Sequence, residues 1–495
     1  MNEKSSEYKN IFKSTFLFGF VQIFNILTKV LLNKAAAVFL GSEGIGLIGI
    51  FQSISEMIKT FFGLGVSQSA VRDVSKANKD GNKEEFSTII TVTHKIIWFT
   101  SLMGAIFTFV LSSYLSTWSF GDDSYSFAFM LLSIVIFFSI LADGQLGILK
   151  GMRQLRSLAK ATIFGSFAGL ITGVPFYYFL GTDGIVPTLL VVAISLIVFS
   201  TYYVKKVEYD KVKLSLKETF SKSSSMIKMG VALMYVAFLG FASDYIIKIY
   251  IWNTSTIEMV GIYQVGITIV AGYFGIVITA MSTDYYPRIS AVHDDNKKLQ
   301  EEMNRQSEMG LLLIGPLIVL FLFLIEFFIS FLYTREFLLA KDYILYALFG
   351  TIIIICSNSM GMILLAKQNS KVFSIYVTIS RLLSVIFLLY TFKIYGMIGL
   401  GIATFIIALL NLYILKVIID KLYSIKWNLS TLYLLIYTLV ISLLSLYIQS
   451  IDDIYLKFSL GIILFTFSFY ISLFFMNRLM NINIVNKIKN KFRKV

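Results

Sequence analysis

The feature that most constrains this chain is a succession of apolar runs, many of 18 or more residues, with few charges inside them. A run of that length crosses the hydrocarbon core of a bilayer as a helix, and only a helix satisfies its own backbone there. Charged residues make up 15% of the 495 residues, against about 25% in soluble proteins. The sequence therefore predicts an all-α polytopic membrane protein rather than a large soluble helical one.

Fourteen candidate transmembrane helices can be delimited. They cover 11–39, 45–70, 88–115, 125–148, 160–180, 185–204, 228–252, 258–283, 307–333, 343–366, 372–394, 397–419, 429–449 and 456–476.

Positive charges follow these segments in a regular alternation. Of the 43 Lys and Arg, 33 lie in the two terminal segments and in every second connection between helices. Cytoplasmic loops carry the excess of Lys and Arg, so both termini are expected in the cytoplasm. The net charge of +14 therefore reflects membrane topology and does not indicate a nucleic-acid partner.

Short matches suggest an internal repeat. GIFQ at 49–52 returns as GIYQ at 261–264, and Gly184-Ile185 returns as Gly396-Met397, both at an offset of 212. GMRQ at 151–154 and LAKQ at 365–368 lie 214 apart. An offset of six helices preserves orientation, so we expect two parallel lobes with a substrate site between them. The predicted divisions are an N-terminal lobe (1–204), a cytoplasmic connector (205–228), a C-terminal lobe (229–420), and helices 13 and 14 with a basic tail (421–495).

Polar residues form stripes on several of these helices. Gln52, Glu56 and Lys59 fall on one face of the second helix, because residues three and four apart lie on the same side. Asp244 precedes Lys248 by one turn, the favourable order for an ion pair. The other polar positions are Asn25, Lys29 and Asn33 on the first helix, Gln264 on the eighth, and Arg381 near the middle of the eleventh.

Cations inside a membrane are costly, at about 2.5–3.5 kcal/mol each near the helix centre, and are expected to face a cavity. The cations Lys29, Lys34, Lys59, Lys248 and Arg381 outnumber the acids recognised inside spans, which are Glu56, Asp244 and Glu326. Such an excess suits an anionic substrate such as a phosphate or pyrophosphate. Two plainer interpretations remain open. Lys34 and Lys95 can reach the interface with their long side chains, and the Glu56–Lys59 and Asp244–Lys248 pairs can be purely structural.

The sequence gives little support for a disulfide, a metal site or a nucleotide-binding site. Cys356 is the single cysteine, so no disulfide can form within the chain, and two histidines are too few for a metal site. No phosphate-binding loop occurs, and no connection on the predicted outer side is long enough for a folded domain. We therefore expect a transporter without a cofactor.

The stretch GLIGIFQSISEMIKTFFGLGVSQSAVRDVSK (46–76) resembles bacterial O-antigen repeat-unit flippases. These are Wzx-type members of the multidrug/oligosaccharidyl-lipid/polysaccharide (MOP) exporter superfamily. The resemblance implies a two-lobed inner-membrane transporter that moves an undecaprenyl-pyrophosphate-linked oligosaccharide by alternating access. It also implies that Lys29, Lys59, Lys248 and Arg381 bind the pyrophosphate.

On this interpretation, amides such as Asn25, Asn33, Gln52 and Gln264 contact the sugars. Glu56 and Asp244 are candidates for ion coupling, and other polysaccharide-assembly proteins are candidate partners. A multidrug or cation antiporter of the same fold is the alternative, although it would favour an acidic cavity. A membrane glycan polymerase is the alternative from another class, although it would need catalytic acids on a larger outer loop.

Overall fold

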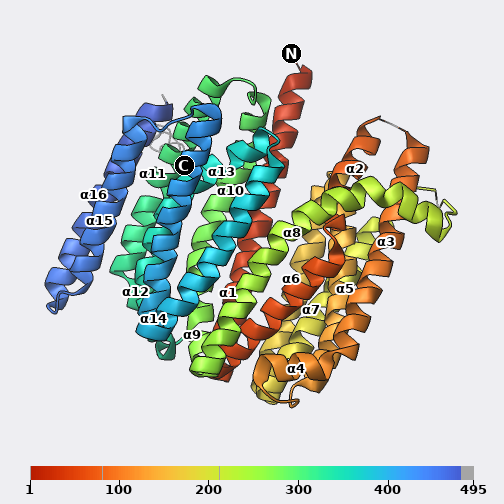
Figure 1. The fold of residues 1–495 in the computed structure, drawn as a ribbon, viewed down its shortest axis with the longest axis horizontal. Helices are drawn as coiled ribbons and strands as arrows, with labels where there is room; N and C mark the ends of the chain where they lie inside the picture. Colours follow the sequence, from red (N-terminus) through yellow and green to blue (C-terminus); the bar gives the residue numbers. More distant parts are fainter. Residues whose placement is uncertain (1, 81, 211, 481–495) are drawn as a thin grey trace. The chain divides into compact units, whose positions relative to one another are not determined.

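A computed structural model describes residues 2–80, 82–210 and 212–480, and all the elements in this part of the chain are helical (Figure 1). The elements are α1 (Asn2–Gly63), α2 (Val66–Asp80), α3 (Lys83–Val110), α4 (Ser112–Phe120), α5 (Ser126–Gly151), α6 (Leu155–Leu180), the 3₁₀ turn η1 (Gly181–Gly184), α7 (Ile185–Val204), α8 (Leu216–Thr254), α9 (Ile257–Ile267), the π-helix η2 (Thr268–Phe274), α10 (Gly275–Ala291), α11 (Asn296–Phe323), α12 (Ile325–Leu332), the 3₁₀ turn η3 (Arg335–Leu339), α13 (Ala340–Ala366), α14 (Ser370–Tyr423), α15 (Leu429–Gln449) and α16 (Ile454–Met480). The basic tail predicted after the last helix falls largely on 481–495, outside the described residues.

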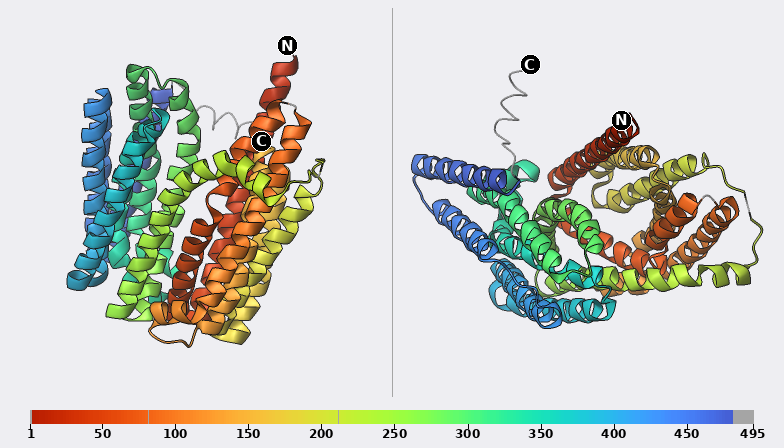
Figure 2. Two further views of the ribbon diagram at one scale, coloured as in Figure 1. Left: turned by 45° about the vertical axis from the view of Figure 1, so that its right-hand side comes forward. Right: turned by 90° about the horizontal axis from the view of Figure 1, so that it is seen from above.

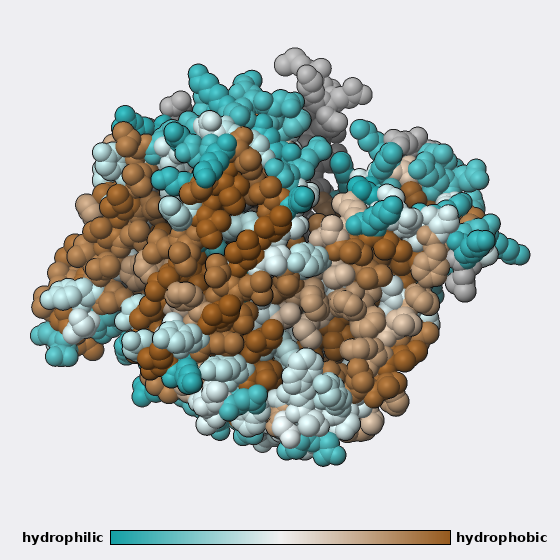
Figure 3. All heavy atoms as spheres, in the orientation of Figure 1, coloured by the Kyte–Doolittle hydropathy of each residue, from teal (hydrophilic) through white to brown (hydrophobic). Residues whose placement is uncertain are grey.

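Within the described residues, eleven helical stretches are long and apolar enough to cross a membrane. Three of them fold back at a glycine with positive φ, namely Gly41 in α1, Gly181 between α6 and α7, and Gly396 in α14. Only glycine adopts that conformation without strain, so each marks a tight turn between two spans. The total is fourteen, as the sequence predicts. On the face drawn in Figure 3, hydrophobic residues predominate in the middle and hydrophilic ones gather toward the upper and lower edges.

The chain forms two compact units, Met1–Gly261 (unit 1) and Ile262–Val495 (unit 2). In unit 1, α5 packs against α2, α3 and α7, and α6 packs against α1 and α7. Helix α8 crosses α1, α2 and α3, as the two views of Figure 2 also show. The predicted boundaries of the sequence repeat concern similarity between halves rather than packing, and they stay a prediction.

In unit 2, the two helices outside the repeat are attached through α11, which packs against α15 and α16. Thr431, Thr438 and Ser445 of α15 face α11 at a spacing of seven residues. Seven residues is the repeat with which two helices pack side by side along a seam. Asn304 of α11 closes one end of this seam, because its amide donates to two backbone carbonyls and accepts from Asn428 N and Thr431 Oγ1. Glu308, an acid that the sequence analysis did not count, accepts from Thr431 at 3.0 Å.

Two turns show the internal repeat in backbone detail. Helix α5 ends with Arg153 at φ 55° and a bond from Gln154 N to Leu149 O, and α13 ends with Gln368 at φ 57° and a bond from Asn369 N to Leu364 O. Both are Schellman endings with a non-glycine residue in the left-handed position. The positions lie 215 apart, so the offset of 214 taken from the GMRQ and LAKQ match is wrong by one residue here.

The same offset corrects a second predicted match. Gly181 has φ 57° and ψ −134°, and Gly396 has φ 57° and ψ −135°. These two residues are conformational counterparts, whereas Gly184, predicted to match Gly396, has φ −73°. Short sequence identities located the repeat, and the backbone conformation shows its register.

The eighth span does not keep α-helical phase. Thr268–Phe274 is a π-helix between α9 and α10, which adds a residue to the turn and rotates everything after it. A polar face counted from Gln264 at α-helical spacing therefore does not stay in phase beyond Phe274.

Candidate functional site

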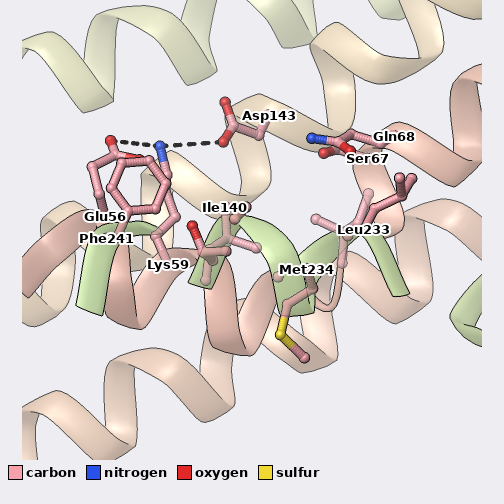
Figure 4. A pocket seen from close by; sticks show the side chains of 14 residues that line it. Glu56, Lys59, Ser67, Gln68, Ile140, Asp143, Leu233, Met234 and Phe241 are labelled. Atoms are coloured by element: carbon pink, nitrogen blue, oxygen red, sulfur yellow. Dashed lines mark hydrogen bonds and ion pairs between the residues drawn. The ribbon is translucent and has the colours of Figure 1, made fainter. Parts of the chain in front are cut away.

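The candidate site of unit 1 is centred on Lys59, which binds carboxylates from two different helices (Figure 4). Its Nζ lies 2.7 Å from Glu56 Oε1, one turn earlier on α1, and 3.4 Å from Asp143 Oδ2 of α5. The Glu56–Lys59 pair was predicted from the polar stripe on this helix. Asp143 was not among the predicted site residues, although an acid inside the apolar segment 125–148 is itself a sign of a functional position.

These three side chains line a cavity of about 250 Å³ between α1, α2, α3, α5 and α8. The other lining residues are Thr60, Gly63, Gly65, Ser67, Gln68, Ile97, Ile140, Leu233, Met234, Ala237 and Phe241.

The Lys59 side chain is 21% exposed, and those of Glu56 and Asp143 are 41% and 47% exposed. All three groups are therefore open to the cavity, and water in that cavity would reduce the cost of their charges in a transmembrane region. With every group ionised, this Lys59 cluster carries two negative charges and one positive charge. An anion that approaches the ammonium therefore meets a net negative charge, which displacement of one carboxylate would reduce.

A break in the helix shapes this cavity. The chain leaves α1 through Leu64 at φ 49° and Gly65 at φ 60°, then continues as α2, which brings Ser67 and Gln68 to the cavity wall. Gly65 lies directly against the backbone of Gly230 on α8, so a side chain at either position would collide with the other helix. These small residues let α8 approach closely enough to close one side of the cavity.

Lys248, the second predicted cation of this unit, has a different environment. Its side chain is 3% exposed, and Nζ donates to Asp244 Oδ2 at 2.7 Å, Ser53 Oγ at 2.6 Å and Gly49 O at 3.3 Å. An ammonium has three donors, and all three are satisfied. The predicted Asp244–Lys248 pair is present, and it joins α8 to α1 away from the Lys59 cavity.

The remaining predicted residues do not line that cavity. In unit 1, Lys29 and Gln52 are exposed, whereas Asn25 and Asn33 are half-buried on α1. In unit 2, Gln264 donates to Thr268 Oγ1 at 3.4 Å, and its Oε1 is buried without a hydrogen-bond partner. Arg381 is exposed on α14. The described residues contain no group of three His, Cys, Asp or Glu side chains that could hold a metal ion.

The helical arrangement is similar to those of solved transporter structures. The structure matches lipid II flippase MurJ in its inward closed conformation with a TM-score of 0.74 over 94% of this chain and 100% of that one, at 15% identity. It matches an inward-facing multidrug resistance MATE transporter of the MOP superfamily with a TM-score of 0.61 over 81% of this chain and 96% of that one, also at 15% identity. These likenesses show the fold.

Sequence comparison then identifies the family. The model of the polysaccharide biosynthesis protein family matches residues 35–342, and the chain belongs to that family. It is also 22% identical over 358 residues to the lipid III flippases of Escherichia coli (strain K12) and Shigella flexneri, covering 69% of this chain and 82% of each relative.

Proposed function

We propose that this protein is a flippase for an undecaprenyl-pyrophosphate-linked oligosaccharide, an O-antigen or capsule repeat unit. It would move this substrate across the cytoplasmic membrane by alternating access between two lobes. The family assignment and the names of the lipid III flippase relatives support this class of substrate. The observation that carries the proposal is the partly exposed ammonium of Lys59 at the wall of a cavity.

In the proposed mechanism, the pyrophosphate takes the place of a carboxylate on Lys59. The lysine suits this exchange because its ammonium is a point charge on a flexible stem, with donors that need no fixed planar partner. The displaced carboxylate, Glu56 or Asp143, then loses its counter-ion. The added negative charge beside the two carboxylates favours the uptake of a cation, which would couple an ion to substrate binding. Glu56 thereby keeps its predicted coupling role, and Asp143 joins it.

Other predicted residues have places in the same proposal. Lys29 and Arg381 would contact the pyrophosphate at other stages of transport, while Asn25, Asn33, Gln52 and Gln264 would contact sugars. Lys248 can contribute directly only after it leaves its three acceptors, so its proposed part is to hold the helix that closes the cavity. Both termini would be cytoplasmic, with polysaccharide-assembly proteins as partners.

Deletion of the gene tests the substrate class. We expect the deletion strain to accumulate lipid-linked oligosaccharide on the cytoplasmic side and to lose surface glycan, with full recovery on complementation. Reporter fusions at Asp123, Asp183 and Asp453 should report the outer side, and fusions at Asn82 and Lys213 the inner side. Normal surface glycan in the deletion strain would contradict the proposal.

One observation favours a second candidate, an antiporter for organic cations. The Lys59 cluster has more carboxylates than ammonium groups, which suits a cationic ligand once the lysine moves aside. The deletion strain separates the two functions. An antiporter predicts increased sensitivity to cationic drugs with surface glycan unchanged, whereas a flippase predicts the reverse.

A further inference from the structure

Six cations gather at one end of unit 1, where α5 ends, α6 begins and α7 ends. This α5–α7 basic patch comprises Lys150, Arg153, Arg156, Lys160, Lys205 and Lys206, all exposed. The cavity around Lys59 contains none of them. Their role is therefore separate from the proposed transport site.

The backbone holds these cations together. The link between α5 and α6 is a tight turn, with Arg153 N bonded to Lys150 O and Gln154 N bonded to Leu149 O, both at 3.0 Å. Under the turn, Leu149 and Leu158 share one buried hydrophobic cluster with Val204 at the end of α7. Because this cluster fixes the three helix ends against each other, the backbone positions of the six cations cannot separate without unpacking it.

The patch has no internal counter-charge. In the described part of the chain, none of its six cations lies within 4 Å of a carboxylate as an ion pair. Cations at helix ends in unit 2 are paired instead, with Arg288 3.0 Å from Asp284, Lys298 3.4 Å from Asp295 and Lys426 3.7 Å from Asp420. Repulsion among six like charges is unfavourable, and an external anion would relieve it.

The surface beside the patch indicates what kind of anion fits. Phe164 of α6 and Val198 of α7 are 44% and 56% exposed on spans whose composition suits lipid. Tyr202, 53% exposed, lies between this apolar surface and the cations, with Lys206 Nζ 4.3 Å from the centre of its ring. Tyrosine and lysine in this order are typical of the membrane interface, with the aromatic ring at headgroup level.

From this arrangement we propose that the α5–α7 basic patch binds the phosphate headgroups of anionic phospholipids from the surrounding membrane. The lysines and arginines contact the phosphates, and the acyl chains lie along Phe164 and Val198. A water-soluble anion would use only the charged half of this surface. This inference does not depend on the identity of the transported substrate.

The test measures binding of phosphatidylglycerol and of phosphatidylcholine to the full-length protein in detergent, by the shift in thermal unfolding temperature with lipid concentration. We expect phosphatidylglycerol to bind more tightly. The variant Arg156→Gln/Lys160→Gln/Lys206→Gln should weaken that binding roughly 100-fold and leave phosphatidylcholine unchanged, since each cation near an anionic headgroup contributes about fivefold.

The matched control is Lys297→Gln/Lys298→Gln/Lys426→Gln, which removes three exposed cations from unit 2 and should bind phosphatidylglycerol normally. If the triple variant in the patch fails to fold, Lys206→Gln alone should weaken binding about fivefold. Unchanged phosphatidylglycerol binding in the patch variants would overturn the proposal. Competition by glycerol phosphate as effective as that by the lipid would also overturn it, because the patch would then be a site for soluble phosphate.

Discussion

The two units share turn geometry but differ in the charge they place beside it. Arg153 after α5 and Gln368 after α13 adopt the same left-handed conformation, 215 positions apart, with the same hydrogen bonds around them. At that offset Asp143 corresponds to Asn358. Asp143 lies 3.4 Å from Lys59, whereas Asn358 donates to Ser282 Oγ at 2.7 Å.

The second helix of each repeat shows the same difference. Glu56 and Lys59 of unit 1 have Thr268 and Ala271 at an offset of 212, in the π-helix of unit 2. The two units thus carry a charged cluster and neutral groups at related positions. A charge in a membrane-spanning segment that the scaffold does not need is costly to keep, which makes the Lys59 cluster a candidate for function rather than for stability.

Loss of the Lys59 ammonium should have the largest effect on transport. Lys59→Ala is expected to abolish surface glycan in a complementation assay, because Lys59 is the one cation among the described residues that line the cavity. Stability should change by about 1 kcal/mol, since both carboxylate partners of Lys59 are more than 40% exposed. Lys59→Arg should restore part of the export. Normal export by the Ala variant at normal expression would remove Lys59 from the proposed site.

Lys248 provides the contrasting case of a lysine whose donors are already satisfied. Lys248→Ala leaves Asp244 without its cation and should destabilise the protein by about 3–5 kcal/mol, with lower expression and export falling in proportion. Lys248→Met/Asp244→Leu, which removes both charges, should recover stability. Thermal unfolding of the purified variants measures both effects. A fully stable Lys248→Ala variant that cannot export would show that Lys248 acts on the substrate instead.

Asp143→Asn makes unit 1 resemble unit 2 at this position. We expect the variant to fold with nearly unchanged thermal stability, because the related position already carries Asn358. Export should fall about tenfold, equivalent to about 1.4 kcal/mol, as one of the two carboxylates proposed to couple an ion is lost. The rate of surface-glycan appearance after induction measures this change. Equal export by variant and wild type would confine ion coupling to Glu56.

The reverse exchange should have the smallest effect. Asn358→Asp adds a carboxylate next to Ser282, and the related positions Thr268 and Ala271 supply no cation to meet it. Export should change less than threefold. Thermal stability should fall by about 1–2 kcal/mol, because the half-buried hydrogen bond from the Asn358 amide to Ser282 is lost. A large loss of export with normal stability would show that unit 2 has a charge-sensitive site as well.

The sequence by itself determined the number of spans, their apolar character and the existence of the repeat. These properties are local, since each depends on the length of one apolar run, on a glycine at a turn, or on short matching segments. The Glu56–Lys59 and Asp244–Lys248 pairs were also predictable, because helical periodicity places residues three and four apart on one face.

Only the tertiary structure decided which lysine faces a cavity. Asp143 reaches Lys59 from a helix more than 80 residues later, and Ser53 and Gly49 reach Lys248 from a helix almost 200 residues earlier. Such partners depend on how helices cross, which no period within one helix encodes. The same holds for the π-helix, whose extra residue changes which side chains share a face with Gln264.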